Sequence, residues 1–174
     1  MVVRADLPSL VMAARRGDKG AFGTVVETCW DDLVRFARSI VGDADAEDIV
    51  QECLVHAWRE LPRLKDADRF RPWITTAVFR RCLRWKRWWW WRRREPLADP
   101  APDTRATSPD DRLDIARLLG RLTRRQRAVL HLTVVEGMSD TEIARALSMT
   151  PGTVRAHRRR ARESLGSILR ERQP

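Results

Sequence analysis

Six residues near the C-terminus have types and spacing suited to binding nucleic acid from one helix: Thr153, Arg155, Ala156, His157, Arg159 and Arg160. They lie near the start of a predicted helix, where the side chains of a recognition helix reach base edges and phosphates. Arginine suits this task because its planar fork donates two hydrogen bonds at once. His157 has no second metal ligand nearby, so we interpret it as a phosphate or groove contact. The alternative is a helical hairpin whose arginines only solvate its surface.

The segment that positions these side chains, residues 139–162, has the pattern of a helix-turn-helix. Ile143, Ala144 and Leu147 give a short first helix its inward face, and Ala144 is small where a second helix would cross. A tight turn follows at residues 148–150, and its last residue can cap the second helix. Because a helix is narrow enough to enter the major groove, the pattern predicts DNA binding.

A second set of polar residues is acidic. Asp45, Asp48, Gln51 and Glu52 fall on one arc of a helix, since successive residues turn by about 100°, and apolar residues fill the opposite side. A negative stripe repels phosphate, so DNA is excluded as its partner. The stripe is either a solvated face or a docking surface for a basic protein.

A third segment, residues 79–94, combines eight basic residues and five tryptophans with no acid. Its predicted nucleic-acid contacts include Arg80, Arg81, Arg84, Lys86 and Arg87. The run of tryptophans at 88–91 cannot all be core, because four consecutive helical residues point in nearly every direction. Bases of a single strand stack on aromatic rings while cations hold the backbone, which favours a single-stranded nucleic acid. Membrane-interface contact, a protein patch or a collapsed helix end are the alternatives.

Composition agrees with a polyanionic partner. The chain carries 34 Lys and Arg against 24 Asp and Glu, a net charge of +10, although a GC-rich genome also raises the arginine content. No stretch approaches the roughly 20 apolar residues of a membrane span, and the first residues lack a secretory signal, so we expect a cytoplasmic protein without membrane insertion. The spacing of Cys29, Cys53 and Cys82 suggests neither a disulfide framework nor a metal site. Buried thiols are the expected role.

Turn residues and prolines divide the chain into two helical blocks. Residues 95–109 carry four of the nine prolines and read as a flexible linker. We therefore predict an all-α fold with two small helical domains, residues 1–94 and 110–174, the second being a helix-turn-helix. Helix-breaking residues and helix caps divide the chain further; the breakers are Gly17, Gly42, Pro62 and Gly137. They predict one short opening helix and a second helix that ends near residue 41. The helices predicted after it span residues 45–61, 72–91, 110–121, 123–136, 139–147 and 150–169.

With these features together, the chain resembles the extracytoplasmic-function type of RNA polymerase sigma factors over nearly its full length. The second conserved region of that family is resembled by three segments: residues 33–37, residues 42–52 and the pair Ala57 and Trp58. The resemblance implies that the acidic helix docks on a coiled coil of the polymerase beta-prime subunit. It also implies a helix, starting with Phe70 and Trp73, that opens and reads the minus-ten element, preceded by a loop around Lys65 that captures a flipped base.

The C-terminal block resembles the fourth region of the family, whose recognition helix reads the minus-thirty-five element. The chain departs from the family in three places: Arg80 and Arg84 stand where Asn and Asp are frequent, Arg158 takes a usually apolar position, and the tryptophan run is not a family feature. Arg158 must therefore extend to solvent or find a partner. Because of the first departure, the bases that the minus-ten helix reads in the family cannot be assigned to this chain.

The function implied is binding without chemistry: promoter DNA as duplex and melted strand, polymerase core, and an inhibitory anti-sigma protein as a further partner. We find no catalytic residues, and no cofactor or metal is expected. A free-standing helix-turn-helix regulator is the alternative. An enzyme on DNA, such as a recombinase, would need a nucleophile or carboxylate-metal site in a strand-containing domain, and the sequence offers no such set.

Overall fold

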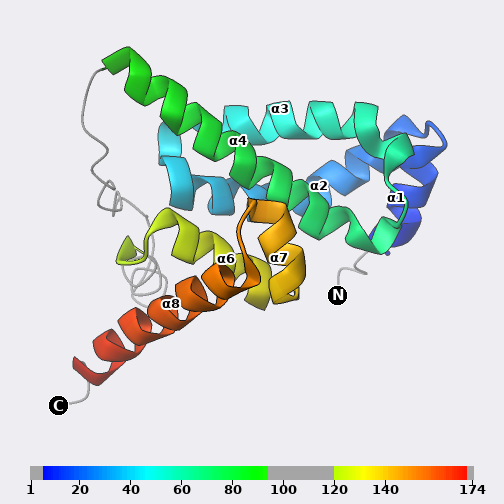
Figure 1. Cartoon of the computed structure of the whole chain (residues 1–174). Coiled ribbons are helices and arrows are strands. Elements are labelled where there is room, and N and C mark those ends of the chain that lie inside the picture. Colours follow the sequence, from blue (N-terminus) through cyan, green and yellow to red (C-terminus); the bar gives the residue numbers. More distant parts are fainter. Residues whose placement is uncertain (1–5, 94–119, 172–174) are drawn as a thin grey trace. The chain divides into compact units, whose positions relative to one another are not determined.

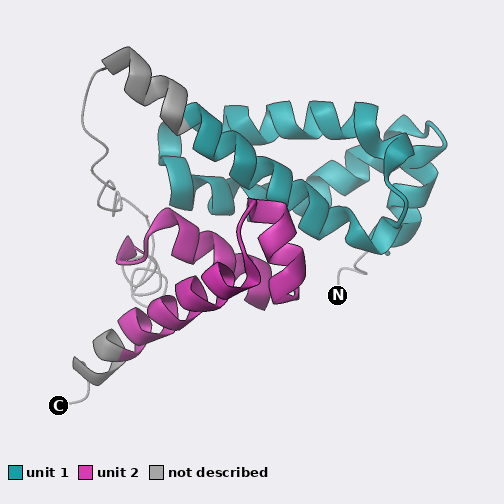
Figure 2. Ribbon diagram, in the orientation of Figure 1, with its two compact units in different colours: residues 1–85 teal, residues 86–174 magenta. Residues whose placement is uncertain are grey.

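A computed structural model describes the backbone of residues 6–93 and 120–171, and the side chains of residues 6–85 and 120–166. Over these ranges every regular element is an α-helix or a short 3-10 helix, which confirms the all-α prediction (Figure 1). The predicted linker at 95–109 and nearly all of the helix predicted at 110–121 lie outside the described residues. The chain separates into two compact units, residues 1–85 and 86–174, each of which is described by itself (Figure 2).

The first unit is built on four helices and two short 3-10 helices. In order they are α1 (Leu7–Arg15), α2 (Lys19–Val41), α3 (Asp43–Glu60), η1 (Leu61–Arg63), η2 (Ala67–Arg69) and α4 (Phe70–Arg93). Asp18 caps α2 by accepting a hydrogen bond from the Ala21 N–H at 3.0 Å. Gly42 separates α2 from α3 with a φ of 92°, a conformation that glycine adopts without steric cost. As predicted, Pro62 stands where α3 ends.

The helices of this unit are held together by a core of aliphatic and aromatic side chains. Phe36 of α2 and Phe79 of α4 lie 6.3 Å apart between ring centroids, and Phe22 of α2 and Trp58 of α3 lie 4.9 Å apart. The three cysteines are buried thiols, as predicted. Burial raises the pKa of the Cys53 thiol to about 11 and that of Cys82 to about 12, so both stay protonated at neutral pH.

The second unit contains α6 (Arg124–Val134), α7 (Asp140–Leu147) and α8 (Pro151–Glu171). Both predicted capping boxes are present, Thr123 with Gln126 and Ser139 with Glu142. Gly137, with a φ of 63°, turns the chain between α6 and α7. A small core joins the three helices and consists of Val129, Leu132, Ile143, Ala144 and Val154, with Met138, Leu147 and Met149 packed against it.

Helix boundaries differ slightly from the predictions. α3 begins at Asp43 rather than Asp45, because Gly42 breaks the chain just before it and acidic residues in a first turn stabilise the helix dipole. The polar stretch at 63–71 is not wholly irregular, since Asp66 accepts a hydrogen bond from the Asp68 N–H at 3.0 Å and supports η2. α8 continues to Glu171.

Candidate nucleic-acid and protein interfaces

The turn between α7 and α8 sets the direction of the predicted recognition helix. Ser148 adopts a left-handed conformation with a φ of 54°, and the Met149 N–H donates to the Ala144 carbonyl at 2.8 Å. Thr150 then caps α8 by accepting a hydrogen bond from the Thr153 N–H at 3.1 Å. Val154 is fully buried against Ile143 and Ala144. These contacts confirm the predicted helix-turn-helix geometry.

The predicted DNA contacts of α8 lie outside the buried core of the second unit. Thr153, Arg155, Arg159 and Arg160 are exposed, and Ala156 and His157 are half-buried. The Thr153 hydroxyl lies 2.9 Å from that of Thr150, so part of its hydrogen-bonding capacity is used inside the protein. Arg159 has only a weak contact, since its Nε lies 3.5 Å from Oε1 of the equally exposed Glu163.

Arg125 is a candidate nucleic-acid contact that the sequence pattern did not indicate, and the surroundings of His157 point to it. Burial lowers the pKa of His157, and the charges of Arg125 and Arg160 lower it further. Arg125, which is exposed on the first turn of α6, therefore extends the positive surface of α8. Its signal in the sequence is a pair of arginines directly after the cap Thr123, where a positive charge is unfavourable to the helix dipole.

Arg158 of α8 is directed to α7. Its Nη1 and Nη2 donate to Oδ1 and Oδ2 of Asp140 at 2.5 and 3.1 Å. Of the two outcomes predicted for this arginine, pairing is therefore the correct one.

The acidic residues of α3 divide into paired and unpaired groups. Asp43 and Glu47 both contact Arg38 of α2, at 3.4 and 2.6 Å. Among the side chains that the structure describes, neither Asp45 nor Asp48 forms an ion pair. Asp48, Gln51 and Glu52 are exposed and Asp45 is half-buried. The negative charge of this face is consequently only partly cancelled within the protein.

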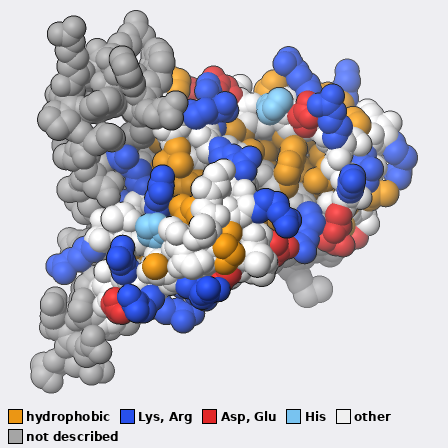
Figure 3. Space-filling view, viewed as in Figure 1, with side chains coloured by type: hydrophobic (Ala, Val, Ile, Leu, Met, Phe, Trp, Pro, Cys, Tyr) orange, Lys and Arg blue, Asp and Glu red, His pale blue; other side chains and the backbone are white. Residues whose placement is uncertain are grey.

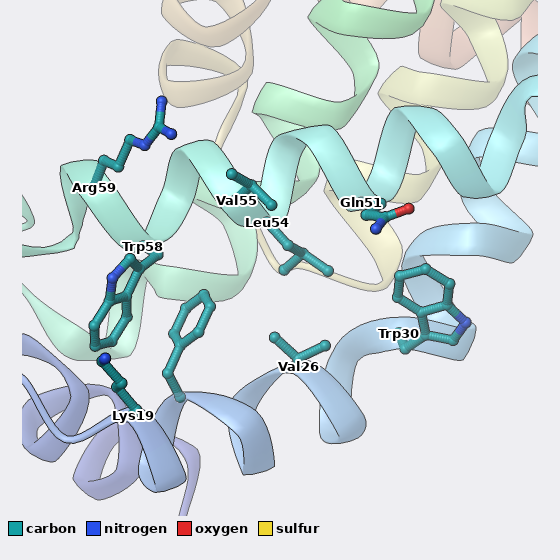
Figure 4. Close-up of a pocket in the computed structure, with 9 residues that line it drawn as sticks. Lys19, Val26, Trp30, Gln51, Leu54, Val55, Trp58 and Arg59 are labelled. Carbon is teal, nitrogen blue, oxygen red and sulfur yellow. The ribbon is translucent and has the colours of Figure 1, made fainter.

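An apolar groove lies beside this face, between α2 and α3 (Figure 4). Its volume is about 430 Å³, and it is lined by Lys19, Phe22, Val26, Trp30, Gln51, Leu54, Val55, Trp58 and Arg59. Val55, which lines the groove, is 52% exposed and adds an apolar surface next to it. Gln51 belongs to both surfaces, whereas Lys19 and Arg59 lie by Trp58 at the other end of the groove (Figure 4). The apolar spacing predicts which side of this helix faces inward, but it does not reveal a groove.

The start of α4 requires one correction. Phe70 was predicted to contact DNA, but its side chain is 0% exposed and is part of the core. Trp73, whose ring lies 5.9 Å from that of Phe70, is half-buried and offers a surface. Lys65, which precedes the helix, is exposed. Phe70 can therefore support Trp73, but it cannot itself reach a base in this conformation.

The basic residues of α4 are not equivalent. Arg80 and Arg84 are exposed, whereas Arg81 is half-buried and binds Glu52 of α3. Lys86, Arg87 and the tryptophans at 88–91 belong to the helical backbone of α4, but their side chains lie outside the described residues. On the face shown in Figure 3, basic side chains are spread over both units.

Nowhere among the described residues do three or more His, Cys, Asp or Glu side chains gather so as to hold a metal ion. None of the described helices combines the length and the apolar character needed to cross a bilayer.

Comparison with known proteins identifies both halves of the chain. Residues 25–92 match the family described as Sigma-70 region 2, and residues 112–165 match Sigma-70, region 4. The chain is 30% identical to the ECF RNA polymerase sigma factor SigL of Mycobacterium tuberculosis, covering 92% of this chain and 97% of that protein. It is 29% identical to the RNA polymerase sigma factor NccH of Alcaligenes xylosoxydans, with 95% of each covered.

Two solved structures have a fold similar to that of this chain. The chain is similar to CnrH, solved in complex with the cytosolic domain of CnrY, with a TM-score of 0.63 and 26% identity over 96% of this chain and 99% of that one. It shares the fold of RpoE from Bartonella quintana, solved with the anti-sigma factor NepR, with a TM-score of 0.70 and 22% identity over 87% and 98%. A match to region 2 as well as region 4 does not favour a free-standing helix-turn-helix regulator. The chain belongs to the extracytoplasmic-function type of RNA polymerase sigma factors, whose role is promoter recognition.

Proposed function

We propose that this sigma factor docks on the polymerase core through the acidic face of α3, formed by Asp45, Asp48, Gln51 and Glu52, and that the partner is the beta-prime subunit. The observation that carries this proposal is the pair of carboxylates, Asp45 and Asp48, left without ion pairs among the described side chains beside an exposed apolar groove. A partner surface with basic residues and one or two apolar side chains would complement both the carboxylates and the groove. Such complementarity governs orientation and rate of encounter as well as affinity.

The second unit would read the minus-thirty-five element with α8. Arg155, Arg159 and Arg160 are exposed and suited to base edges and phosphates, while Thr153, Ala156 and His157 lie among them near the start of the helix. Arg125 of α6 would add a phosphate contact, because its charge reaches His157. Phosphate contacts fix the register of the helix on the duplex, and base contacts supply the specificity.

The minus-ten element and the melted strand would be held by α4 and the segment before it. Lys65, Trp73, Arg80 and Arg84 provide cations and a stacking surface, and Lys86 and Arg87 would continue it. The proposed domains, residues 1–94 and 110–174, would be joined by residues 95–109. An extended linker of about 3.1 Å per residue spans on the order of 45 Å, enough to reach two separated promoter elements.

In this mechanism the chain performs no chemistry and needs no cofactor, because the polymerase makes the phosphodiester bonds. It would work in the cytoplasm, where its promoter is found.

An anti-sigma protein is a further proposed partner. CnrH and RpoE of Bartonella quintana are both solved with a second protein, and RpoE with one named as an anti-sigma factor. The groove between α2 and α3 has the apolar lining that an amphipathic helix of such a protein requires.

Transcription with purified components tests the proposal. The full chain is added to polymerase core and genomic fragments, and RNA ends are mapped. We expect starts at defined sites that depend on the chain, and weak binding of duplex DNA when polymerase is absent. Tight, specific duplex binding without polymerase, combined with no defined start, would instead indicate a free-standing regulator.

A further inference from the structure

Arg81 of α4 binds Glu52 of α3 in an asymmetric way. Nε of Arg81 donates to Oε2 of Glu52 at 2.7 Å, and Nη2 contacts the same oxygen. The other carboxylate oxygen, Oε1, accepts no hydrogen bond within the described part of the chain. One oxygen of Glu52 is thus held by the protein, while the other remains available.

The surroundings show which member of the pair is fixed. The Arg81 side chain is 31% exposed, and its guanidinium lies 6.0 Å from the centroid of the Trp85 ring one turn along α4. The Glu52 side chain is 55% exposed and belongs to the proposed docking face. Arg81 is therefore the inner, anchored member of the pair, and Glu52 is the outer one.

We infer that Arg81 is a positioning residue of the polymerase-docking face, and not the DNA contact that the sequence predicts. It holds Glu52 by Oε2 and presents Oε1 to a basic group of the partner. The inference rests on the proposed docking role of α3. Of the three arginines predicted to contact DNA on this part of α4, Arg80 and Arg84 are exposed, whereas Arg81 is half-buried and directs its Nε and Nη2 to Glu52 of α3.

The physical benefit is preorganisation. A glutamate side chain loses rotamer freedom when a partner immobilises it, and this loss opposes association. Because Arg81 already restricts Glu52, less freedom is lost on docking. The guanidinium also reduces the net charge that the basic partner meets, so the expected gain in affinity is modest.

A double-mutant cycle on the full chain tests the inference by measuring affinity for polymerase core. Glu52→Ala should weaken binding by about tenfold if this carboxylate docks. Arg81→Ala should weaken it by about twofold to fivefold, the range of partly exposed ion pairs. In the Glu52→Ala background, Arg81→Ala should have no further effect, because the arginine acts only through that carboxylate.

A matched control is available in the same unit. Arg63→Ala removes another surface ion pair between arginine and glutamate, since Nη1 of Arg63 lies 2.7 Å from Oε2 of Glu60. Its affinity for core should equal that of the wild type. Arg81→Lys, which keeps the charge, should restore most of the affinity. If the alanine variant unfolds at a lower temperature, Arg81→Gln, which removes the charge but keeps a long side chain, replaces it in the cycle.

A second readout separates positioning from DNA binding. At polymerase concentrations that saturate the variant, promoter opening by Arg81→Ala should match the wild type, whereas Arg84→Ala should lose opening. If Arg81→Ala keeps full core affinity, or loses opening at saturation, the inference is overturned while docking through Glu52 stands. If Glu52→Ala itself keeps full affinity, the docking role of Glu52 is wrong and the inference falls with it.

Discussion

Arg158, on the recognition helix α8, is bound through both Nη atoms to the two carboxylate oxygens of Asp140, at the start of α7. The two side chains are 25% and 19% exposed, so the pair is largely shielded from solvent. It replaces an apolar contact one turn after the buried Val154. The angle between the two helices of the DNA-binding motif therefore depends on an ion pair as well as on the core.

Arg158→Ala should destabilise the second unit by about 1 to 3 kcal/mol, because Asp140 would lose the charged partner of both its oxygens. Hydrogen exchange of peptides from α7 and α8 locates the effect, and urea unfolding measures it. Arg155→Ala, at an exposed position of the same helix, should change stability by less than about 0.5 kcal/mol. Equal stability of the two variants would show that the pair contributes nothing.

Asp48→Lys should lower the affinity for polymerase core by at least about tenfold, since it reverses a charge of the proposed docking face that has no ion pair among the described side chains. Glu47→Lys reverses a neighbouring charge of the same helix, but Glu47 contacts Arg38 of α2 at 2.6 Å. Its effect should be mainly on stability. Binding of both variants to core is measured by fluorescence anisotropy. Equal losses of affinity would indicate a general charge effect and no defined docking face.

Arg155→Ala should weaken transcription from a promoter with its minus-thirty-five element by about 1 to 3 kcal/mol if the contact is to a base edge. The matched control is the same promoter with that element scrambled, on which wild type and variant should perform alike. Initiation rates on both templates provide the measurement. An undiminished preference for the intact element would remove Arg155 from the reading surface.

The free energy of unfolding of the second unit should decrease as the pH is lowered, because His157 takes up a proton less readily in the folded chain. Burial, then Arg125 and Arg160, lower the pKa of this imidazole below its ordinary 6.5, so the unfolded chain takes up the proton first as the pH decreases. The stabilisation is present above about pH 6.5 and is lost as the pH falls towards the lowered pKa. Proton NMR titration of the full chain measures that pKa directly.

His157→Gln provides the control, because its unfolding midpoint should depend less on pH between about 7.5 and 5.5 than that of the wild type. A titration midpoint at or above the ordinary value would contradict the expected proximity of the two arginines.

Much of this protein is determined by local sequence. The capping boxes at Thr123 and Ser139, the glycine breaks and the apolar spacing predicted the described helices to within a few residues, because helix signals act over short distances along the chain. The helix-turn-helix and the acidic stripe of α3 follow from the same short-range rules.

Only the tertiary structure decided which charges remain available to partners. Arg81 meets Glu52 across 29 residues of chain and Arg158 meets Asp140 across 18, while Phe70 is drawn into the core and Arg125 towards His157. The groove beside Gln51 likewise depends on how α2 packs against α3. Periodicity tells which side of a helix is polar, but pairing and burial depend on the distance and rotation between helices, which no single helix encodes.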